Sequence, residues 1–301
     1  MGDLVSTSET PSGTPRARLR ELLAGPEPLI APGAYDALSA RLVEQAGFDA
    51  VYMTGFGTSA SRIGRPDVGL LSAGDMVDQV RRLVDAVDRP VIADADTGYG
   101  NAINVIHTVR AYEQAGVAAL HLEDQVMPKK CGHMSGKVVV PREEMVGKIR
   151  AAVEARRDPD LVLVARTDAA AVHGLDDAIE RARAFADAGA DVLFVEAPTS
   201  EDDIATVARE LHGVAPLVFN WAEGGRTPPL PFERVRELGF SLVLYPIATL
   251  LAATAAVQGV LRTIAEERSP LSVMDTLPTF DDFTDLIGLP EVRALEQRFA
   301  D

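Results

Sequence analysis

One short segment of the chain gathers the residue types that nucleophilic or acid–base catalysis requires. It reads Lys129-Lys130-Cys131-Gly132-His133, and Cys131 is the single cysteine of the sequence. Two lysines and a histidine near a thiol are expected to lower its pKa and to hold it as a reactive thiol or thiolate. A lone cysteine is more often a small buried apolar residue, but this loop is polar, cationic and glycine-flanked. Cysteine–histidine nucleophilic catalysis and proton donation to a carbanion are both open.

Three carboxylates could bind a metal ion. Asp94 and Asp96 are two residues apart, so an extended backbone places both side chains on one side. Glu123 adds a third hard oxygen ligand, and such a cluster repels itself unless a cation neutralises it. Mg²⁺ is the usual occupant when few protein ligands share a site with water, and Mn²⁺ is an alternative. The competing interpretation is that Asp96 only caps the next helix.

Two further features could bind an anion. Arg166 ends an apolar run and is suited to a bidentate contact with a carboxylate or an enolate, or to an ion pair with Glu196 or Asp168. The glycine-rich segment 54–58 follows another apolar run, and its backbone amides could face a carboxylate. A simple tight turn is an equally good interpretation. A dinucleotide fingerprint is disfavoured because Gly64 and the residues after it interrupt the helix that should follow at once.

The elements that must position these residues alternate along the chain. Short apolar runs, expected as strands, span 29–31, 50–54, 90–94, 118–123, 161–166, 191–196, 216–220 and 241–245. Helical patterns span 72–87, 102–115, 141–155, 175–188 and 201–211, among others. Eight strands separated by helices predict a single (β/α)8 TIM-type barrel of the α/β class, with a doubly wound open sheet as the competitor. Catalytic groups of a barrel lie at the carboxyl ends of its strands, where most of these candidates fall.

Composition limits the partners and the location. The chain has 301 residues and a net charge of −16, which opposes binding to nucleic acid or to an anionic membrane surface. No apolar run looks long enough to cross a bilayer, and one cysteine excludes a disulfide framework. We therefore expect a cytoplasmic protein. Its expected parts are a flexible leader over 1–20, the barrel over 21–268, and a helical extension over 269–301 that packs on the barrel or on a neighbouring subunit.

The motifs together resemble the isocitrate lyase and phosphoenolpyruvate mutase superfamily. The segment 129–134 occurs in register with Asp-Ala-Asp-Thr-Gly-Tyr-Gly at 94–100, His-Leu-Glu-Asp-Gln at 121–125 and Ala-Arg-Thr-Asp-Ala at 165–169. The resemblance covers about 24–265 and is to the short-chain branch, which includes methylisocitrate lyases, 2,3-dimethylmalate lyases and carboxyphosphonoenolpyruvate mutases. It implies a barrel whose last helix is exchanged between subunits, a homotetramer, and Mg²⁺ that chelates a 2-oxo acid or its enolate.

The resemblance also implies a role for each matching residue. The 2-oxo acid part of the site would be lined by Tyr52, Thr54, Gly55 and Phe56. The metal would be held directly by Asp94, through water by Asp96 and Glu123, and from an outer shell by Asp67. A mobile gating loop would carry Lys129, Cys131, Gly132 and His133. Arg166 would contact the developing oxyanion, while Glu196 and Asn220 would bind the carboxylate of the second product.

The implied reaction is a Mg²⁺-dependent carbon–carbon cleavage. A 2-hydroxy di- or tricarboxylate, of the substituted malate or methylisocitrate type, would give a 2-oxo acid and a carboxylate. Tyr52 would act as a phenolate base and Cys131 would protonate the carbanion. Phe56 and the run 223–228 resemble the dimethylmalate lyase, oxaloacetate hydrolase and carboxyphosphonoenolpyruvate mutase branch. The alternatives are a phosphonate mutase, an oxaloacetate hydrolase or decarboxylase, and a barrel that only binds a ligand; a mutase needs no cysteine acid.

Overall fold

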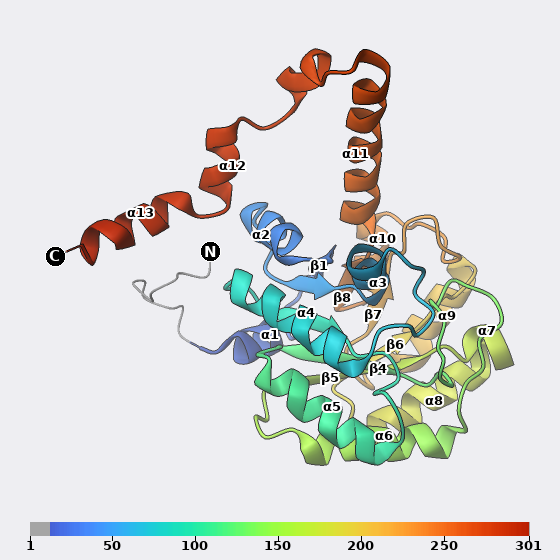
Figure 1. Cartoon of the computed structure of the whole chain (residues 1–301). Coiled ribbons are helices and arrows are strands. Elements are labelled where there is room, and N and C mark those ends of the chain that lie inside the picture. The colour runs from blue at the N-terminus through green and yellow to red at the C-terminus, as the bar shows by residue number, and fades with distance from the viewer. Residues whose placement is uncertain (1–12, 301) are drawn as a thin grey trace.

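Eight parallel strands form the centre of the structure, a computed structural model that describes residues 13–300. They are β1 (Leu29–Ala34), β2 (Val51–Met53), β3 (Val91–Asp94), β4 (Ala119–Glu123), β5 (Val162–Thr167), β6 (Val192–Val195), β7 (Val218–Asn220) and β8 (Leu242–Tyr245). Their hydrogen-bonded order is β6-β5-β4-β3-β2-β1-β8-β7, and a parallel bridge from Leu193 to Leu217 joins the two ends. The sheet therefore curls into a nearly closed barrel, which confirms the (β/α)8 prediction against an open sheet (Figure 1).

Helices surround this barrel and connect its strands. They are α2 (Ala37–Gln45), α3 (Gly55–Ile63), α4 (Ala73–Ala86), α5 (Ala102–Gln114), α6 (Arg142–Ala155), α7 (Ala170–His173), α8 (Leu175–Asp187), α9 (Glu201–Leu211) and α10 (Phe232–Glu237). Side-chain oxygens of Ser72, Asn101 and Ser200 accept main-chain N–H bonds at the starts of α4, α5 and α9. These caps satisfy amides that a helix leaves unpaired, and they explain why those predicted helices begin where the sequence indicates.

The strands read as continuous apolar runs because the barrel buries both of their faces. One set of side chains packs outward against the helices, and a second set fills the barrel interior. The interior set includes Ile92, Val164, Phe194 and Leu244, which come from different strands and are almost completely buried. A parallel sheet covered on both sides needs such residues at every position rather than at alternate ones.

Helix α1 (Pro15–Leu23) closes the amino-terminal end of the barrel, which corrects the expected leader over 1–20. Leu19 and Leu23 join the interior apolar cluster, and Leu19 is 0% exposed. Arg16 donates to the carbonyl of Val117 at 2.9 Å, and Arg20 pairs with Asp191 at 3.0 Å. These arginines hold the helix against loops at the amino-terminal end of the barrel. Several arginines close together in this segment therefore indicate a helix bound to the barrel rather than a solvated tail. The rest of the expected leader, residues 1–12, lies outside the described residues.

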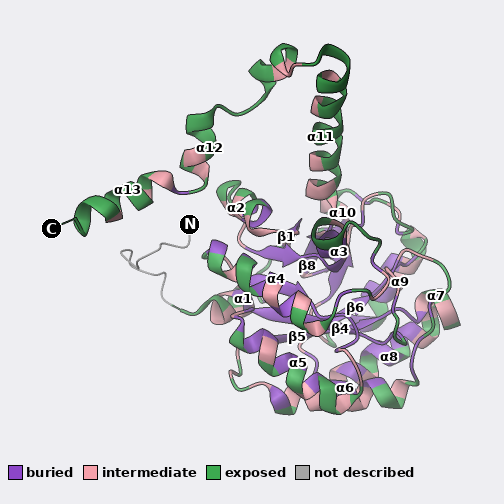
Figure 2. Ribbon diagram, in the orientation of Figure 1, coloured by how far each residue is buried: buried purple, intermediate pink, exposed green. Residues whose placement is uncertain are grey.

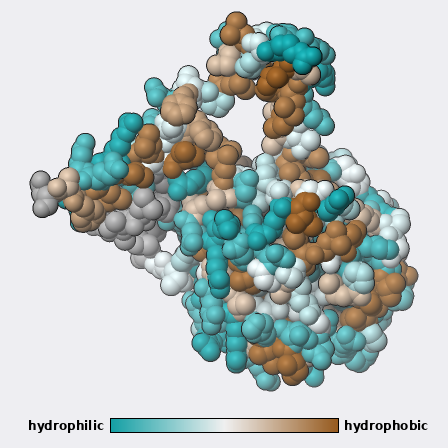
Figure 3. Space-filling view, in the orientation of Figure 1, coloured by the Kyte–Doolittle hydropathy of each residue, from teal (hydrophilic) through white to brown (hydrophobic). Residues whose placement is uncertain are grey.

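Three helices and a 3₁₀ turn form an arm that leaves the barrel after β8. They are α11 (Ala248–Glu267), η1 (Leu271–Thr276), α12 (Phe280–Leu286) and α13 (Leu289–Arg298), and no residue of α11 is buried. Figure 2 shows the arm exposed along almost its whole length, and Figure 3 shows hydrophobic residues on it. Within the described residues, α11 alone is long and apolar enough to cross a membrane by length and composition. The expectation that no run has that length was therefore wrong.

The root of α11 lies against strand β1. Thr249 Oγ1 donates to the carbonyl of Gly33 at 2.6 Å, and the main chain at Pro246 passes so close to Gly33 that a Cβ there would overlap it. The N–H of Ile247 donates to Glu223 at 3.0 Å. The arm therefore starts from a fixed joint at the carboxyl end of the barrel.

Candidate active site

A cavity of about 200 Å³ opens at the carboxyl ends of the strands. Predicted site residues that line it are Tyr52, Thr54, Phe56, Asp67, Asp94, Lys129, Cys131, Gly132, His133, Arg166, Glu196 and Asn220. The remaining three do not line the cavity but contact residues that do: Gly55 contacts Asp94, Asp96 contacts Lys129, and Glu123 contacts Arg166. The barrel therefore brings together residues that are up to 168 positions apart, between Tyr52 and Asn220.

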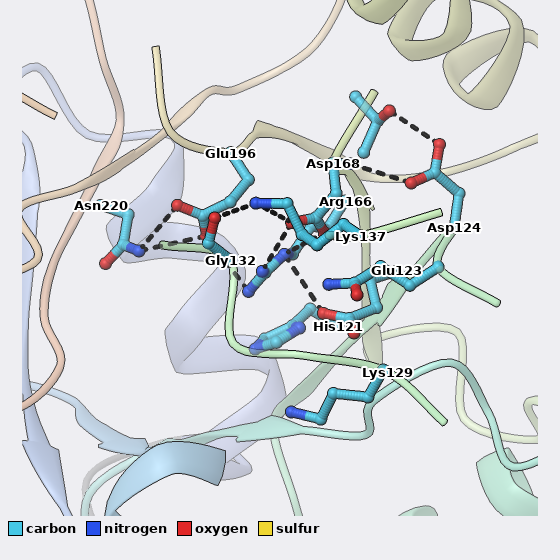
Figure 4. Close-up of polar contacts among 12 residues, drawn as sticks. His121, Glu123, Asp124, Lys129, Gly132, Lys137, Arg166, Asp168, Glu196 and Asn220 are labelled. Atoms are coloured by element: carbon cyan, nitrogen blue, oxygen red, sulfur yellow. Dashed lines mark hydrogen bonds and ion pairs between the residues drawn. The ribbon is translucent and has the colours of Figure 1, made fainter. Parts of the chain in front are cut away.

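Arg166 lies at the centre of a buried ion network at the end of β5. Its guanidinium is 3.3 Å from Glu123, 3.0 Å from Asp168 and 3.1 Å from Glu196 (Figure 4). It also stacks over the Phe194 ring. Burial alone would raise the pKa of Glu196, but Arg166, His133 and Lys137 together outweigh it and hold that pKa well below its usual range. The ion pairs predicted for Arg166 are present. Its guanidinium also lines the cavity, so contact with a substrate carboxylate or enolate stays a prediction.

The carboxylates expected to hold a metal ion fit that role. Burial raises the pKa of Asp96 to about 6 and that of Glu123 well above its usual value, so Lys129 and Arg166 do not fully offset the cost of burying these carboxylates. Glu123 Oε1 is buried without a hydrogen-bond partner, and Asp96 Oδ1 is buried with the Lys129 ammonium 2.7 Å away. A Cβ at position 55 would overlap Asp94 Oδ2, so only glycine at this position leaves room for that carboxylate oxygen. A divalent cation would neutralise such a donor set.

The site offers few direct ligands rather than a complete cage. Within residues 13–300, no three His, Cys, Asp or Glu side chains converge to ligand distances. A Mg²⁺ ion usually accepts this arrangement, because it retains several waters and binds one or two carboxylates together with substrate oxygens.

Lys129 links the acidic cluster to the loop that follows β4. Its ammonium lies 2.6 Å from Asp67 Oδ2 and 2.7 Å from Asp96 Oδ1 and is almost fully buried. Burial would lower the pKa of Lys129, but the carboxylates of Asp96 and Asp67 outweigh it and raise that pKa, so the lysine is charged. The N–H of Cys131 donates to the carbonyl of Asp67 at 3.1 Å. The loop that carries the cysteine is thus held at Asp67 by two contacts, one to its carboxylate and one to its main-chain carbonyl.

The environment of Cys131 corrects the expectation that its pKa is lowered. Burial raises the pKa of this thiol from 9.0 to about 11, and the charges of Asp67 and Glu196 add to the effect. The neighbouring cations point elsewhere: Lys129 faces Asp67, and Lys130 donates to the carbonyl of Gly136 at 2.8 Å. Closeness in the sequence therefore wrongly predicted a positive electrostatic environment around the sulfur. A protonated thiol in the cavity is suited to donate a proton and is poorly suited to attack as a nucleophile.

Tyr52 is likewise a neutral phenol in this structure rather than the expected phenolate. Burial and the carboxylate of Asp94 raise its pKa well above 10. Its hydroxyl is 2.9 Å from Nε2 of His121, whose own pKa is lowered by burial. His121 lies 3.7 Å from Asp94. The phenol and the neutral imidazole form a proton-transfer pair beside the carboxylates. His121 is the first residue of the 121–125 motif, and the sequence assigned it no role.

The segment 54–58 is the start of helix α3 and is not the expected turn. Thr54 caps the helix, and its Oγ1 accepts the N–H of Gly57 at 3.2 Å. The glycines obscured the helix because glycine has a low helix propensity. Thr54 and Phe56 at the amino terminus of this helix line the cavity, so binding of an anion by its amides stays a prediction in a different local structure.

Lys137 and Glu223 had no predicted role at the site, whereas Asp168 was predicted as an ion-pair partner of Arg166. Lys137 is buried, contacts the carbonyl of Gly132 and lies 3.5 Å from Asp168. Asp168 receives two hydrogen bonds from Arg166, at 3.0 and 3.2 Å. Glu223 lines the cavity with one buried oxygen that has no hydrogen-bond partner. The only signal for Lys137 is its nearness to Cys131 in the chain, and that signal does not specify contact.

The fold and the site define a barrel enzyme that handles small carboxylic acids. A family model described as phosphoenolpyruvate phosphomutase matches residues 19–265. The chain is 48% identical to 2,3-dimethylmalate lyase of Eubacterium barkeri over 94% of its own length and 98% of that protein. It therefore belongs to the phosphoenolpyruvate phosphomutase family, within the isocitrate lyase and phosphoenolpyruvate mutase superfamily that its motifs resemble.

Solved structures agree with this membership. The crystal structure of a 2,3-dimethylmalate lyase has a TM-score of 0.90 and 40% identity, covering 96% of both chains. A complex of phosphonopyruvate hydrolase with oxalate and Mg²⁺ has a TM-score of 0.88 and 34% identity, covering 96% of this chain and 100% of that one. The alignment extends over the arm as well as the barrel, because both matches cover nearly the whole chain.

Proposed function

We propose that the protein is a divalent-metal-dependent carbon–carbon lyase that acts on a substituted malate, forming a 2-oxo acid and a second carboxylate. The observation that carries this proposal is the protonated thiol of Cys131 in the same cavity as Arg166 and the acidic cluster. Cleavage of a 2-hydroxy acid leaves a carbanion that needs a proton, and the thiol is the acid placed to supply it. The 48% identity to a 2,3-dimethylmalate lyase supports the same choice.

The cavity wall supports a small substrate with alkyl substituents. Apolar lining residues are Phe56, Met134, Ala222, Pro246 and Ile247. The buried cations already have carboxylate partners: Arg166 holds Glu196 and Lys129 holds Asp67. A third carboxylate on the substrate would enter without a free cation to meet it, and burying an unpaired charge is costly. We therefore favour an alkylated malate over a tricarboxylate such as methylisocitrate.

The metal ion belongs with the carboxylates at the ends of β3 and β4. Asp94 would ligate Mg²⁺ directly, Asp96 and Glu123 would hold its waters, and Asp67 would stand behind them; Mn²⁺ would serve as a substitute. When bound, the ion supplies Lewis-acid polarisation of the substrate oxygens and neutralises charge. The solved Mg²⁺ and oxalate complex of phosphonopyruvate hydrolase supports this assignment.

The chain's own residues then move two protons and hold one charge. The hydroxyl of Tyr52 is placed to accept the proton of the substrate hydroxyl and to pass its own to Nε2 of His121, 2.9 Å away. Arg166 stabilises the oxygen charge that forms when the substrate hydroxyl loses its proton. As the carbon–carbon bond breaks, that oxygen becomes the carbonyl of the 2-oxo acid, and the electron pair of the broken bond stays on the carbon of the second product. Cys131 donates its proton to the carbanion carbon. Glu196 and Asn220, 3.2 Å apart, border the place of the second product.

Assembly and location complete the proposal. The exposed apolar face of α11 fits a second copy of this chain, with the helix exchanged between subunits of a homotetramer. A soluble cytoplasmic enzyme with no nucleic-acid or membrane partner agrees with its charge of −16.

The test is a release assay with Mg²⁺ against 2,3-dimethylmalate, methylisocitrate, isocitrate, oxaloacetate and phosphonopyruvate. We expect a 2-oxo acid from 2,3-dimethylmalate, at a higher kcat/KM than from either tricarboxylate. Phosphorus NMR would follow phosphonopyruvate in parallel. Turnover of phosphonopyruvate alone would replace the lyase by a mutase or hydrolase, and turnover of oxaloacetate alone would move the protein to the hydrolases.

A further inference from the structure

Two loops at the mouth of the cavity contact each other. The β4–α6 loop (124–141) carries Cys131 and His133, and the β7–α10 loop (221–231) lies opposite it. Both contribute lining residues to the same cavity. The contacts between them come from two adjacent residues, Gly225 and Arg226, and none of the roles proposed above uses either one.

The main chain at these two residues fixes the ring of His133. The N–H of Arg226 donates to His133 Nδ1 at 3.0 Å, so Nδ1 carries no proton in this arrangement and the ring proton of the neutral tautomer is on Nε2. Nε2 lies 3.1 Å from Glu196. Gly225 lies against the same ring, because a Cβ there would be 2.6 Å from Nδ1. The position therefore requires glycine for close approach rather than for backbone freedom.

The side chain of Arg226 makes a second connection. Its Nη2 donates to Ser135 Oγ at 2.6 Å, two residues beyond His133. One residue of the β7–α10 loop thus holds the β4–α6 loop at two points. From His133 the chain of contacts continues through Glu196 to Asn220 and Arg166.

We propose that Arg226 is a positioning residue that latches the β4–α6 loop over the cavity and sets the orientation of His133 toward Glu196. It acts through His133 and Ser135 and does not touch the reacting atoms. The latch keeps Cys131 enclosed and within the cavity. This inference rests on the proposed function only in treating the cavity as the site of turnover.

The side chain and the main-chain contact can be tested separately. Arg226→Ala and Ser135→Ala remove the guanidinium contact, whereas Gly225→Ala displaces the amide from His133. We expect Arg226→Ala to lower kcat about tenfold, the size of one hydrogen bond, with a much smaller change in KM. Arg226→Lys should recover most of the loss. The Arg226→Ala/Ser135→Ala double variant should match the single variants, because both remove the same contact.

A second measurement needs no substrate. Iodoacetamide alkylation of Cys131, the single cysteine, reports how often the loops open, and we expect Arg226→Ala and Gly225→Ala to alkylate several-fold faster than the parent. Arg209→Gln is the matched control for the exposed arginine, and Gly147→Ala is the control for glycine, since nothing lies within 4 Å of a Cβ there. Thermal melts would verify that each variant folds.

Unchanged alkylation together with a kcat within twofold of the parent in Arg226→Ala and Gly225→Ala would overturn the latch. An Arg226→Lys variant as impaired as Arg226→Ala would also overturn it. Because alkylation is measured without turnover, a failure of the lyase assignment leaves this result readable.

Discussion

Burial decides the chemistry of the single thiol. Cys131 follows two lysines in the chain, yet its sulfur faces Asp67 and Glu196, and its pKa rises to about 11. A thiol in that environment retains its proton at neutral pH and can act as an acid. The same residue among cations would be a thiolate and could act as a nucleophile. The electrostatic environment in the folded protein therefore favours proton donation over nucleophilic attack, a choice that the sequence left open.

Replacing the thiol by a hydroxyl tests this acid. We expect Cys131→Ser to lower kcat at least about a hundredfold, the usual contribution of general acid catalysis. The melting temperature and Mg²⁺ affinity should stay close to those of the parent, because the two side chains are similar in size. Turnover at the parental rate would remove Cys131 from the proton-donor role.

The pH dependence of alkylation tests the pKa itself. With a pKa of about 11 instead of 9.0, the thiolate fraction at pH 8 is about a hundredfold below that of an ordinary cysteine. Because only the thiolate reacts, the rate constant with iodoacetamide should keep rising about tenfold per pH unit through pH 10. A rate constant that levels off between pH 9 and pH 10 would mean that the thiol ionises normally. Glutathione measured in parallel supplies the reference slope.

The metal assignment makes a prediction about one carboxylate. Asp94 is 4% exposed and belongs to the proposed direct ligands. We expect Asp94→Ala to weaken Mg²⁺ binding at least about tenfold in a calorimetric titration, because Mg²⁺ sites rely on only one or two protein carboxylates. Asp202→Ala, at an exposed position of α9, is the control for loss of one negative charge. Equal Mg²⁺ affinity in the Asp94 variant and the parent would contradict the assignment.

At the scale of elements, the strands were easier to predict than the helices that flank them. All eight strands match the expected runs because burial on both faces imposes apolar residues at every position. Helix α3 was missed because its glycines disguise it, and α1 was missed because its arginines resemble a solvated tail. Propensity and polarity report only on local preference, whereas tertiary contacts hold these two helices in place.

Helix α1 predicts a stability effect far from the cavity. Leu19 is 0% exposed inside the barrel floor, so Leu19→Ala should lower the free energy of unfolding by about 2–5 kcal/mol. Ile103→Ala, at a residue 71% exposed, is the matched control. Urea unfolding followed by circular dichroism measures both. A Leu19→Ala variant as stable as the control would show that α1 contributes little to the barrel.

At the scale of the whole molecule, the arm stands apart from the barrel that it follows. Val257 is 57% exposed and Leu261 is 59% exposed on neighbouring turns of α11. An apolar surface of this length is typical of an interface between subunits. The alternation of strands and helices predicted the barrel, but it carried no information on where the last helices point, because no residue of α11 is buried against the barrel.

Charged residues on this face test the assembly. We expect the parent to elute as a tetramer by light scattering and the Val257→Asp/Leu261→Asp variant to shift to a smaller species, because carboxylates would be buried at the contact. Ile103→Asp introduces the same charge on an exposed position of the barrel and should leave the mass unchanged. A monomeric parent would contradict the proposed exchange of the arm.

The joint at Pro246 and Ile247 connects that assembly to the cavity. Both residues line the cavity, and the next residue begins α11. Because contacts with Gly33 and Glu223 fix this joint, a shift of the cavity wall on ligand binding would move the root of the arm as well. Thermodynamic reciprocity then requires the same coupling free energy in both directions. If subunits exchange the arm as proposed, substrate binding would strengthen or weaken assembly, and dilution would change substrate affinity through Pro246 and Ile247.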